Sequence, residues 1–199
     1  MKTTIACLAL LAAACASGRD VEWVDYGENP ALNPDYLATS MAYATPGDAH
    51  AELAKGVGDY EVSGRYWVAP DQPPLETMAT AKVEMILGGR YLLQHYESTF
   101  RGDPYKGVML MGHNNLSDEY WSLWIDSSST GFSLSTGHET PDGAIELAGR
   151  LRDPMTPDGR PYRTVIRRQD DGTFTLSMFD TRPDGAEFQV MELTYRKKG

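Results

Sequence analysis

Cysteine, clustered positive charge and long apolar runs are all scarce in this chain of 199 residues. Its two cysteines, Cys7 and Cys15, both lie near the start, so the remainder of the chain has no disulfide and its core alone must stabilise it. The apolar stretch at Ile5–Ala14 is shorter than the roughly 20 residues that a membrane-spanning helix needs. Basic side chains cluster only at Arg167-Arg168 and Arg196–Lys198, and the formal net charge is −10. Binding to nucleic acid or to an anionic lipid surface is therefore disfavoured, because neutralising phosphates requires clustered Lys and Arg.

Motifs that mark catalytic or metal sites are also missing. No serine lies in a G-x-S-x-G turn, which leaves hydrolase chemistry unsupported. Acidic residues are abundant, but no spacing selects a pair for glycosidase-type catalysis. The histidines show neither H-x-H nor H-x₃-H spacing, so His95, His113 and His138 could share zinc or an iron porphyrin only if a barrel brought them together. The sequence predicts no catalytic residue, no metal ligand and no cofactor.

Residues 1–15 have the pattern of a signal peptide. Lys2 supplies a positive charge, an apolar stretch follows, and Leu11–Cys15 resembles the bacterial lipobox, in which small residues precede a cysteine that is lipidated. We therefore predict a lipid anchor at Cys15 as the only contact with a membrane, and a location at the periplasmic face of the outer membrane. The alternative is ordinary cleavage around Ala14 or Ala16, which would release the protein into the periplasm.

Residues 16–47 are acidic and contain Pro30, Pro34 and Pro46, which interrupt any regular pattern. This composition predicts a flexible, extended tether. The segment also has four aromatic side chains, and the alternative is that they dock on the domain that follows: Trp23, Tyr26, Tyr36 and Tyr43.

Residues 48–199 have the pattern of a single all-β domain. Asp48 is expected to cap a short helix over Ala49–Lys55, and ten stretches of alternating apolar and polar residues follow. The expected strands are Gly58–Val68, Thr77–Ile86, Tyr91–Phe100, Tyr105–His113, Tyr120–Asp126, Phe132–Glu139, Ile145–Leu151, Tyr162–Arg168, Phe174–Asp180 and Phe188–Arg196. Short connections with Gly, Pro, Asp and Asn join them, and the longest expected connection is Arg152–Pro161.

An antiparallel meander of about ten strands must close on itself or leave a long unpaired edge. Closure predicts an up-and-down β-barrel of about ten strands, with the short N-terminal helix closing one end. A barrel of this size leaves a cavity unless bulky residues fill it, and the chain has 4 Trp, 11 Tyr and 9 Met that could line or fill the interior. The set of inward residues depends on parity, since a shift by one residue inverts every strand face.

The stretch Trp121–Gly131 shows what depends on this parity. Trp124 and Asp126 share one strand face, whereas Trp121 and Ile125 share the other. If the face of Trp124 and Asp126 points inward, the stretch is the wall of a binding site. The alternative is a turn in which Asp126 and the following serines bond backbone amides and the final glycine adopts a positive φ.

Arg90 is a second candidate, because it follows two glycines and begins a strand. Its guanidinium could pair with a carboxylate such as Glu97, Asp126 or Glu192. Such a pair would either close the barrel end as an ion pair or form part of a ligand site.

Five groups of residues resemble an uncharacterised bacterial family known as domain of unknown function 1579. They are Leu87–Arg90, Gly107 with Gly112, Trp124–Gly131, Asp153–Thr156 and Val190–Arg196. The resemblance covers about Ala49 to Lys197 and implies a calycin-like, lipocalin-type barrel whose biochemical role is not established. The chain departs from the pattern at Tyr60, where lipocalin-like first strands often have Trp, and at His113-Asn114, where members usually have Tyr-Asp.

Together these features favour a barrel that binds a small apolar or amphipathic molecule without transforming it. The residues expected to line its lumen are Arg90, Gln94, Tyr96, Trp124, Asp126 and Glu192. One alternative is an enzyme with a polar lumen that uses Arg90 with Asp126 or Glu192. Another is a structural or envelope-interaction module whose barrel is packed solid. The sequence identifies neither the ligand nor a protein partner.

Overall fold

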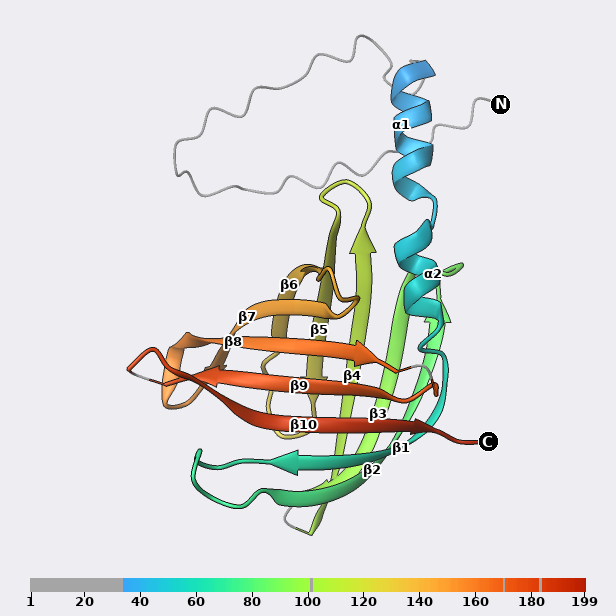
Figure 1. The fold of residues 1–199 in the computed structure, drawn as a ribbon. Helices are drawn as coiled ribbons and strands as arrows, with labels where there is room; N and C mark the ends of the chain where they lie inside the picture. Colours follow the sequence, from blue (N-terminus) through green and yellow to red (C-terminus); the bar gives the residue numbers. More distant parts are fainter. Residues whose placement is uncertain (1–33, 101, 170, 183) are drawn as a thin grey trace, which may run out of the picture. The chain divides into compact units, whose positions relative to one another are not determined.

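Ten antiparallel strands follow one another along the chain and close into a barrel (Figure 1). The strands are β1 (Gly58–Tyr66), β2 (Leu75–Ile86), β3 (Tyr91–Phe100), β4 (Asp103–Asn114), β5 (Glu119–Asp126), β6 (Ser133–Glu139), β7 (Ile145–Asp153), β8 (Thr156–Arg168), β9 (Phe174–Thr181) and β10 (Glu187–Lys197). Each strand pairs with its neighbours in sequence, and β1 also pairs with β10, which closes the sheet. The up-and-down barrel expected from the alternating pattern is therefore confirmed.

The computed structural model describes residues 34–100, 102–169, 171–182 and 184–199. The barrel lies wholly in one compact unit, Thr39–Gly199. The expected signal peptide, the expected lipidation at Cys15 and residues 16–33 of the expected tether lie outside the described residues and stay predictions. Within the described ranges, no helix is long and apolar enough to cross a membrane.

The described residues before the barrel form two helices, α1 (Pro34–Ala44) and α2 (Asp48–Ala54). The prediction of an extended tether was wrong for residues 34–44, which are helical. A proline is compatible with the first position of a helix, where its missing N–H would have no partner. Pro34 occupies that position in α1, and the charge of Asp35 beside it favours a helix start.

The short helix α2 covers one end of the barrel, as the sequence predicted. Its Leu53 is 3% exposed and packs into the barrel core. His50 of α2 packs edge-on against His113 of β4, with ring centroids 5.9 Å apart. The N-cap is Gly47 rather than the expected Asp48, and the Gly47 N–H donates to Nδ1 of His50 at 3.1 Å.

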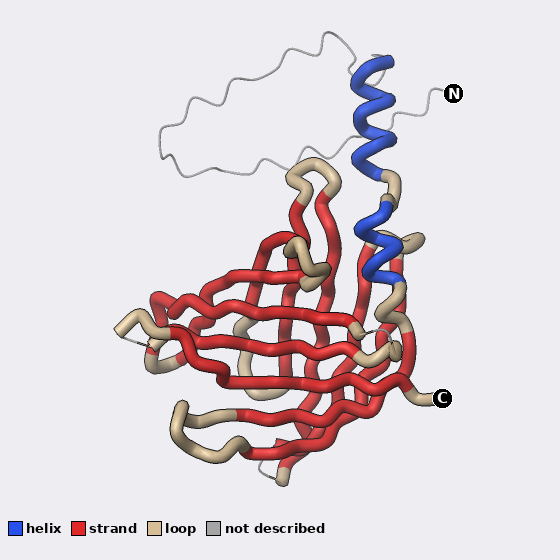
Figure 2. Tube along the Cα trace, viewed as in Figure 1, coloured by secondary structure: helices blue, strands red, loops and turns tan. Residues whose placement is uncertain are grey.

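We call this end of the barrel the α2 end, and the opposite end the mouth. The turns after β2, β4, β6 and β8 lie at the α2 end, whereas those after β1, β3, β5, β7 and β9 surround the mouth (Figure 2).

The register decides which residues point inward. Residues directly opposite each other on paired strands share a face of the sheet. Starting from the buried Tyr60, the successive partners on β2, β3, β4 and β5 are Ala81, Tyr96, Gly107 and Asp126. The face of Trp124 and Asp126 therefore points into the barrel.

The β7–β8 hairpin differs from the expectation. The segment predicted as the longest connection, Arg152–Pro161, is mostly strand, and Pro154-Met155 alone forms the turn. Its prolines are compatible with a strand because residues 156–161 pair with β7 only, and pairing with β9 begins at Tyr162. Asp153 closes the turn by accepting hydrogen bonds from the backbone N–H groups of Met155 and Thr156, both at 2.8 Å.

The core is packed more densely on one side of the barrel than on the other. Near β1 it contains an aromatic stack, in which Phe174 and Tyr195 lie 4.1 Å apart with an interplanar angle of 12°. Tyr60 meets the same two rings edge-on at 5.2 and 5.9 Å. The residues buried around this stack belong mainly to β1–β4, so that side of the interior is filled by side chains.

Candidate functional site

The interior is less filled along the middle of β8 and β9 than at the centre of β1–β4. Inward residues such as Val62 and Val83 are 0% and 3% exposed. On β8 and β9, by contrast, the inward side chains of Ile166, Leu176 and Met178 are only partly buried. In a closed barrel an inward side chain can meet solvent only where the space beside it is not filled. The inward side chains along β8–β9 are therefore only partly covered by the rest of the interior.

The accessible part of the lumen is mainly apolar, with two short polar side chains. Apart from the charged Asp126 and Arg160 at the mouth, its partly buried inward residues on β5, β8, β9 and β10 include Ser122, Trp124, Thr164, Ile166, Phe174, Leu176, Met178 and Met191. Such a lining suits an apolar molecule, because burying apolar surface is the main source of affinity in sites of this kind.

Trp124 is held against the lumen wall by Asp126. Its indole Nε1 donates to Oδ2 of Asp126 at 2.9 Å, while the N–H and Oγ of Ser128 donate to Oδ1 at 2.8 and 2.6 Å. Burial alone would raise the pKa of the Asp126 carboxyl, but hydrogen bonds from Ser128, Trp124 and Tyr105 outweigh it and hold that pKa below its usual value. A carboxylate has about four acceptor sites, and these donors occupy them. Asp126 is thus held in its ionised form by these donors, and it orients Trp124.

The structure shows the inward direction on which one interpretation of Trp124–Gly131 depends and the turn contacts of the other, and the binding site itself stays a prediction. The stretch lines the lumen, and Asp126 also forms the predicted turn contacts with Ser128. The expected positive φ at Gly131 is not found.

Gly107 provides the space for the Trp124 ring. A Cβ placed on Gly107 would overlap the six-membered ring of Trp124, which lies across the facing strand β4. The ring also meets Tyr96 edge-on, with centroids 6.0 Å apart. The glycine is one of those noted in the sequence, but only the structure shows what requires it.

Gln94 and Tyr96 point inward as expected, into the filled side of the lumen. Nε2 of Gln94 donates to the Tyr195 hydroxyl at 3.3 Å. Burial raises the pKa of the Tyr96 hydroxyl, and the hydroxyls of Tyr66 and Ser98 are near enough to affect it. Neither is placed well enough for a hydrogen bond, so the buried Tyr96 hydroxyl has no partner among the described residues.

Arg90 does not reach the lumen, and that prediction was wrong. Its Nη2 donates to the carbonyl of Ala44 at 2.7 Å and its Nη1 to that of Leu87 at 3.2 Å, so it holds the segment before α2. It lies in the turn after β2 at the α2 end, whereas Asp126 ends β5 at the mouth. An enzyme that uses Arg90 together with Asp126 is contradicted by this separation.

Glu192 was also placed wrongly, because it lies on the outer face. Its neighbour Leu193 points inward and is buried, so Glu192 must point outward. It forms an ion pair with Arg65 and accepts a hydrogen bond from Nε2 of Gln189 at 3.2 Å. The hollow that it lines, of about 440 Å³, is on the outside of the barrel wall.

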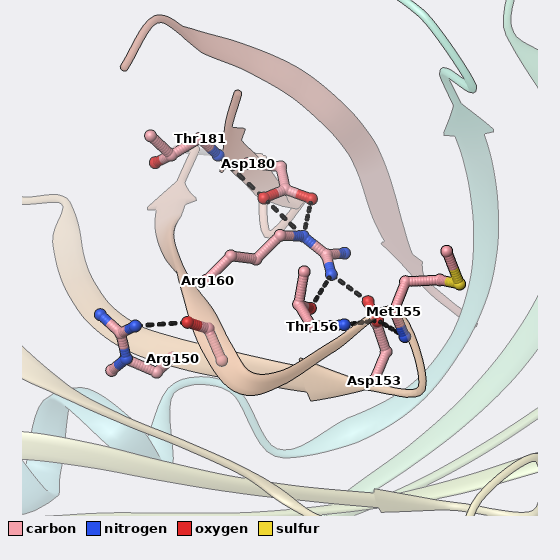
Figure 3. A network of polar contacts seen from close by, with 8 residues as sticks. Arg150, Asp153, Met155, Thr156, Arg160, Asp180 and Thr181 are labelled. Carbon is pink, nitrogen blue, oxygen red and sulfur yellow. Dashed lines mark hydrogen bonds and ion pairs between the residues drawn. The ribbon is translucent and has the colours of Figure 1, made fainter. Parts of the chain in front are cut away.

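A charged cluster at the mouth was missed by the sequence analysis (Figure 3). Nε of Arg160 donates to both carboxylate oxygens of Asp180, at 2.9 and 2.7 Å. Its Nη1 forms an ion pair with Asp153 and donates to Oγ1 of Thr156 at 3.0 Å. Asp180 is only 9% exposed, whereas the side chains of Arg160 and Asp153 are 29% and 31% exposed, so the cluster extends from the barrel interior to solvent at the mouth.

One signal could have pointed to this cluster. Asp153–Thr156 is one of the groups of residues that resemble the family, but the prolines around it predict a loop. In the β7–β8 hairpin, Asp153 and Arg160 lie close together near the turn.

Asp153 makes the stability of the protein dependent on pH. The hydrogen bond from Arg160 is the main cause that lowers its pKa from 3.8 to about 2. Because the unfolded chain binds this proton more readily, Asp153 stabilises the fold above the unfolded pKa, and this is lost as the pH falls from about 4 to about 2. We expect Asp153→Asn to flatten the decline of the free energy of unfolding over this range, as measured by urea denaturation. Asp158→Asn on the same hairpin is the control, and an unchanged decline in Asp153→Asn would contradict the assignment.

The histidines form no metal site in the described part of the chain. No group of three His, Cys, Asp or Glu side chains there is placed to hold a metal ion. His50 and His113 meet at the α2 end, and burial together with the charge of His113 lowers the pKa of His50.

Exposed apolar side chains surround the mouth. They come from three different turns: Val68 after β1, Phe132 after β5 and Met155 after β7, with exposures of 78%, 65% and 88%. Exposed apolar groups around an opening are typical of sites that an apolar molecule approaches.

Comparison with known proteins adds to this geometry. A family model described as "Protein of unknown function (DUF1579)" matches residues 45–197. The chain belongs to this family. The match begins just before α2 and ends with β10, so the DUF1579 region coincides with the helix-covered barrel.

The DUF1579 barrel also resembles a solved structure. The crystal structure of Rv2717c from M. tuberculosis is similar over 78% of this chain and 100% of that chain, with a TM-score of 0.54 and 13% sequence identity. At this identity the likeness concerns the fold alone. No curated protein matches the chain.

Proposed function

We propose that the barrel binds a small apolar or amphipathic molecule in the lumen along β8–β9, and that the molecule enters through the mouth. The observation that carries the proposal is the uneven interior. Apolar side chains that point inward on β8 and β9 remain partly accessible, although the inward residues at the centre of β1–β4 are buried. Folding normally buries such side chains, and a bound apolar molecule would complete that burial.

The entrance supports the same proposal. Trp124 provides a rigid aromatic wall, fixed by Asp126, beside the accessible lumen. The charged cluster of Arg160 lies at the mouth, so a bound molecule would meet an apolar interior and a polar entrance. An amphipathic molecule matches this distribution, with its apolar part inside.

The test is a fluorescence titration with N-phenyl-1-naphthylamine, an uncharged apolar probe that brightens when it leaves water. Thr164 points inward on β8, whereas its neighbour Val165 points outward. We expect Thr164→Trp to fill the lumen and weaken probe binding by about tenfold or more, equivalent to ~1.4 kcal/mol. Val165→Trp should leave the affinity nearly unchanged, and thermal denaturation should show that both variants are folded.

Two outcomes would refute the proposal. The first is the absence of saturable probe binding to the unmodified protein. The second is equal probe binding by the folded Thr164→Trp and Val165→Trp variants, which would place the probe outside the lumen.

A further inference from the structure

Arg160 has one nitrogen that the barrel leaves unused. Nε is occupied by Asp180, and Nη1 by Asp153 and Thr156. Nη2 makes no hydrogen bond to any residue that the structure describes, and Figure 3 shows it at the free side of the guanidinium. Two carboxylates hold the guanidinium plane, so the direction in which Nη2 can donate is fixed.

The charges at the mouth determine what this nitrogen can bind. Asp153 and Asp180 contribute two carboxylates to the cluster and Arg160 one guanidinium, an excess of one negative charge. An anionic group placed there would be repelled and would lose its hydration, because the charge of Arg160 is already compensated. An uncharged oxygen would accept a charge-assisted hydrogen bond without bringing another negative charge.

On this basis, and resting on the proposed function, we propose that the ligand has an uncharged, oxygen-bearing head group, such as an alcohol or an ester. Its oxygen accepts a hydrogen bond from Nη2 of Arg160, and its apolar chain lies along β8–β9. The negative mouth excludes fatty acid anions of the same chain length. Arg160 therefore selects the head group, and the lumen selects the chain.

The experiment is displacement of bound N-phenyl-1-naphthylamine by four molecules with the same chain: 1-octanol, methyl octanoate, octanoate and octylamine. At neutral pH we expect the alcohol and the ester to displace the probe at concentrations about tenfold lower than octanoate, since like charges repel strongly in a partly buried site. At about pH 4, where a carboxylic acid is largely uncharged, octanoic acid should compete nearly as well as the ester. The comparison at neutral pH and at pH 4 uses the unmodified protein, so its result does not depend on whether a variant folds.

Variants then test the role of Arg160 itself. Arg160→Lys keeps the charge but removes the planar fork, so it should reduce the advantage of the alcohol and the ester over octylamine. Arg163→Lys is the control, because Arg163 lies on the same strand but forms its ion pairs with Glu146 and Glu187 on the outside. It should leave the order of the four competitors unchanged.

The outcomes separate this inference from the proposed function. If the probe binds in the lumen but octanoate competes as well as octanol at neutral pH, the head-group inference is wrong and the proposed function stands. Octylamine as the strongest competitor would also overturn the inference, because the carboxylates rather than Arg160 would then select the ligand. If the probe does not bind, the proposed function itself fails.

Discussion

Replacing Gly107 by alanine is expected to lower the free energy of unfolding by about 1–3 kcal/mol, the range for overpacking a filled interior. The added Cβ would overlap the Trp124 ring, and backbone on both strands limits how far either can move. The ring would have to turn away and give up its hydrogen bond to Asp126. Because Trp124 is part of the lumen wall, we also expect a clear loss of probe affinity. Urea denaturation followed by tryptophan fluorescence measures the first effect, and probe titration the second.

Gly131 provides a matched control for this substitution. It lies in the turn that follows Asp126, does not have a positive φ, and a Cβ added there would meet nothing closer than Oγ of Ser129 at 3.9 Å. Gly131→Ala should therefore change stability by less than about 0.5 kcal/mol. Equal stability of the two variants would show that the Trp124 ring is not confined by Gly107.

Replacing Tyr195 by alanine is expected to lower the free energy of unfolding by about 3–5 kcal/mol, as for other large aromatic residues removed from a core. Tyr195 is 1% exposed, stacks on Phe174 and meets Tyr60 edge-on. Removing its ring would leave a cavity among β1, β9 and β10, where the barrel closes. Thermal or urea denaturation measures this loss.

Tyr195→Phe separates the ring from its hydroxyl. The phenyl ring keeps the stack, and only the hydrogen bond from Gln94 is lost. The expected cost is about 1 kcal/mol, since one buried donor is left unpaired. If Tyr195→Phe were as destabilising as Tyr195→Ala, the hydroxyl and not the aromatic packing would be the main contribution of this residue.

The sequence was sufficient to predict the barrel because its strands alternate and its turns are short. A closed sheet buries one face of every strand, so apolar residues recur at every second position. The predicted strand from Tyr91 to Phe100 has the bounds of β3, and the others differ mainly at their ends. Where prolines stand in a strand, as at Pro157 and Pro161 in β8, composition indicated a loop and the paired backbone was missed.

The site could be predicted only in part. Contacts across the barrel decide which face of a strand points inward and at which end of the barrel a residue lies. Trp124 and Asp126 were identified, but their inward direction depends on pairing with Gly107 and Met109 of β4. Glu192 and Leu193 are adjacent, and nothing local indicates which of them faces inward. The Arg160 cluster connects β7, β8 and β9. The turn at Asp153 is the one feature of the local sequence that points to it.

The methionine methyl groups offer the most direct test of a ligand in the lumen. Met178 and Met191 face each other across β9 and β10 and point inward, whereas Met78 points outward on β2 and is 66% exposed. With methyl-labelled methionine, NMR spectra can be recorded while octanol is added to the full-length protein. We predict saturable chemical-shift changes at Met178 and Met191 and none at Met78. A shift confined to Met78, or no shift at Met178 and Met191, would contradict binding in the lumen.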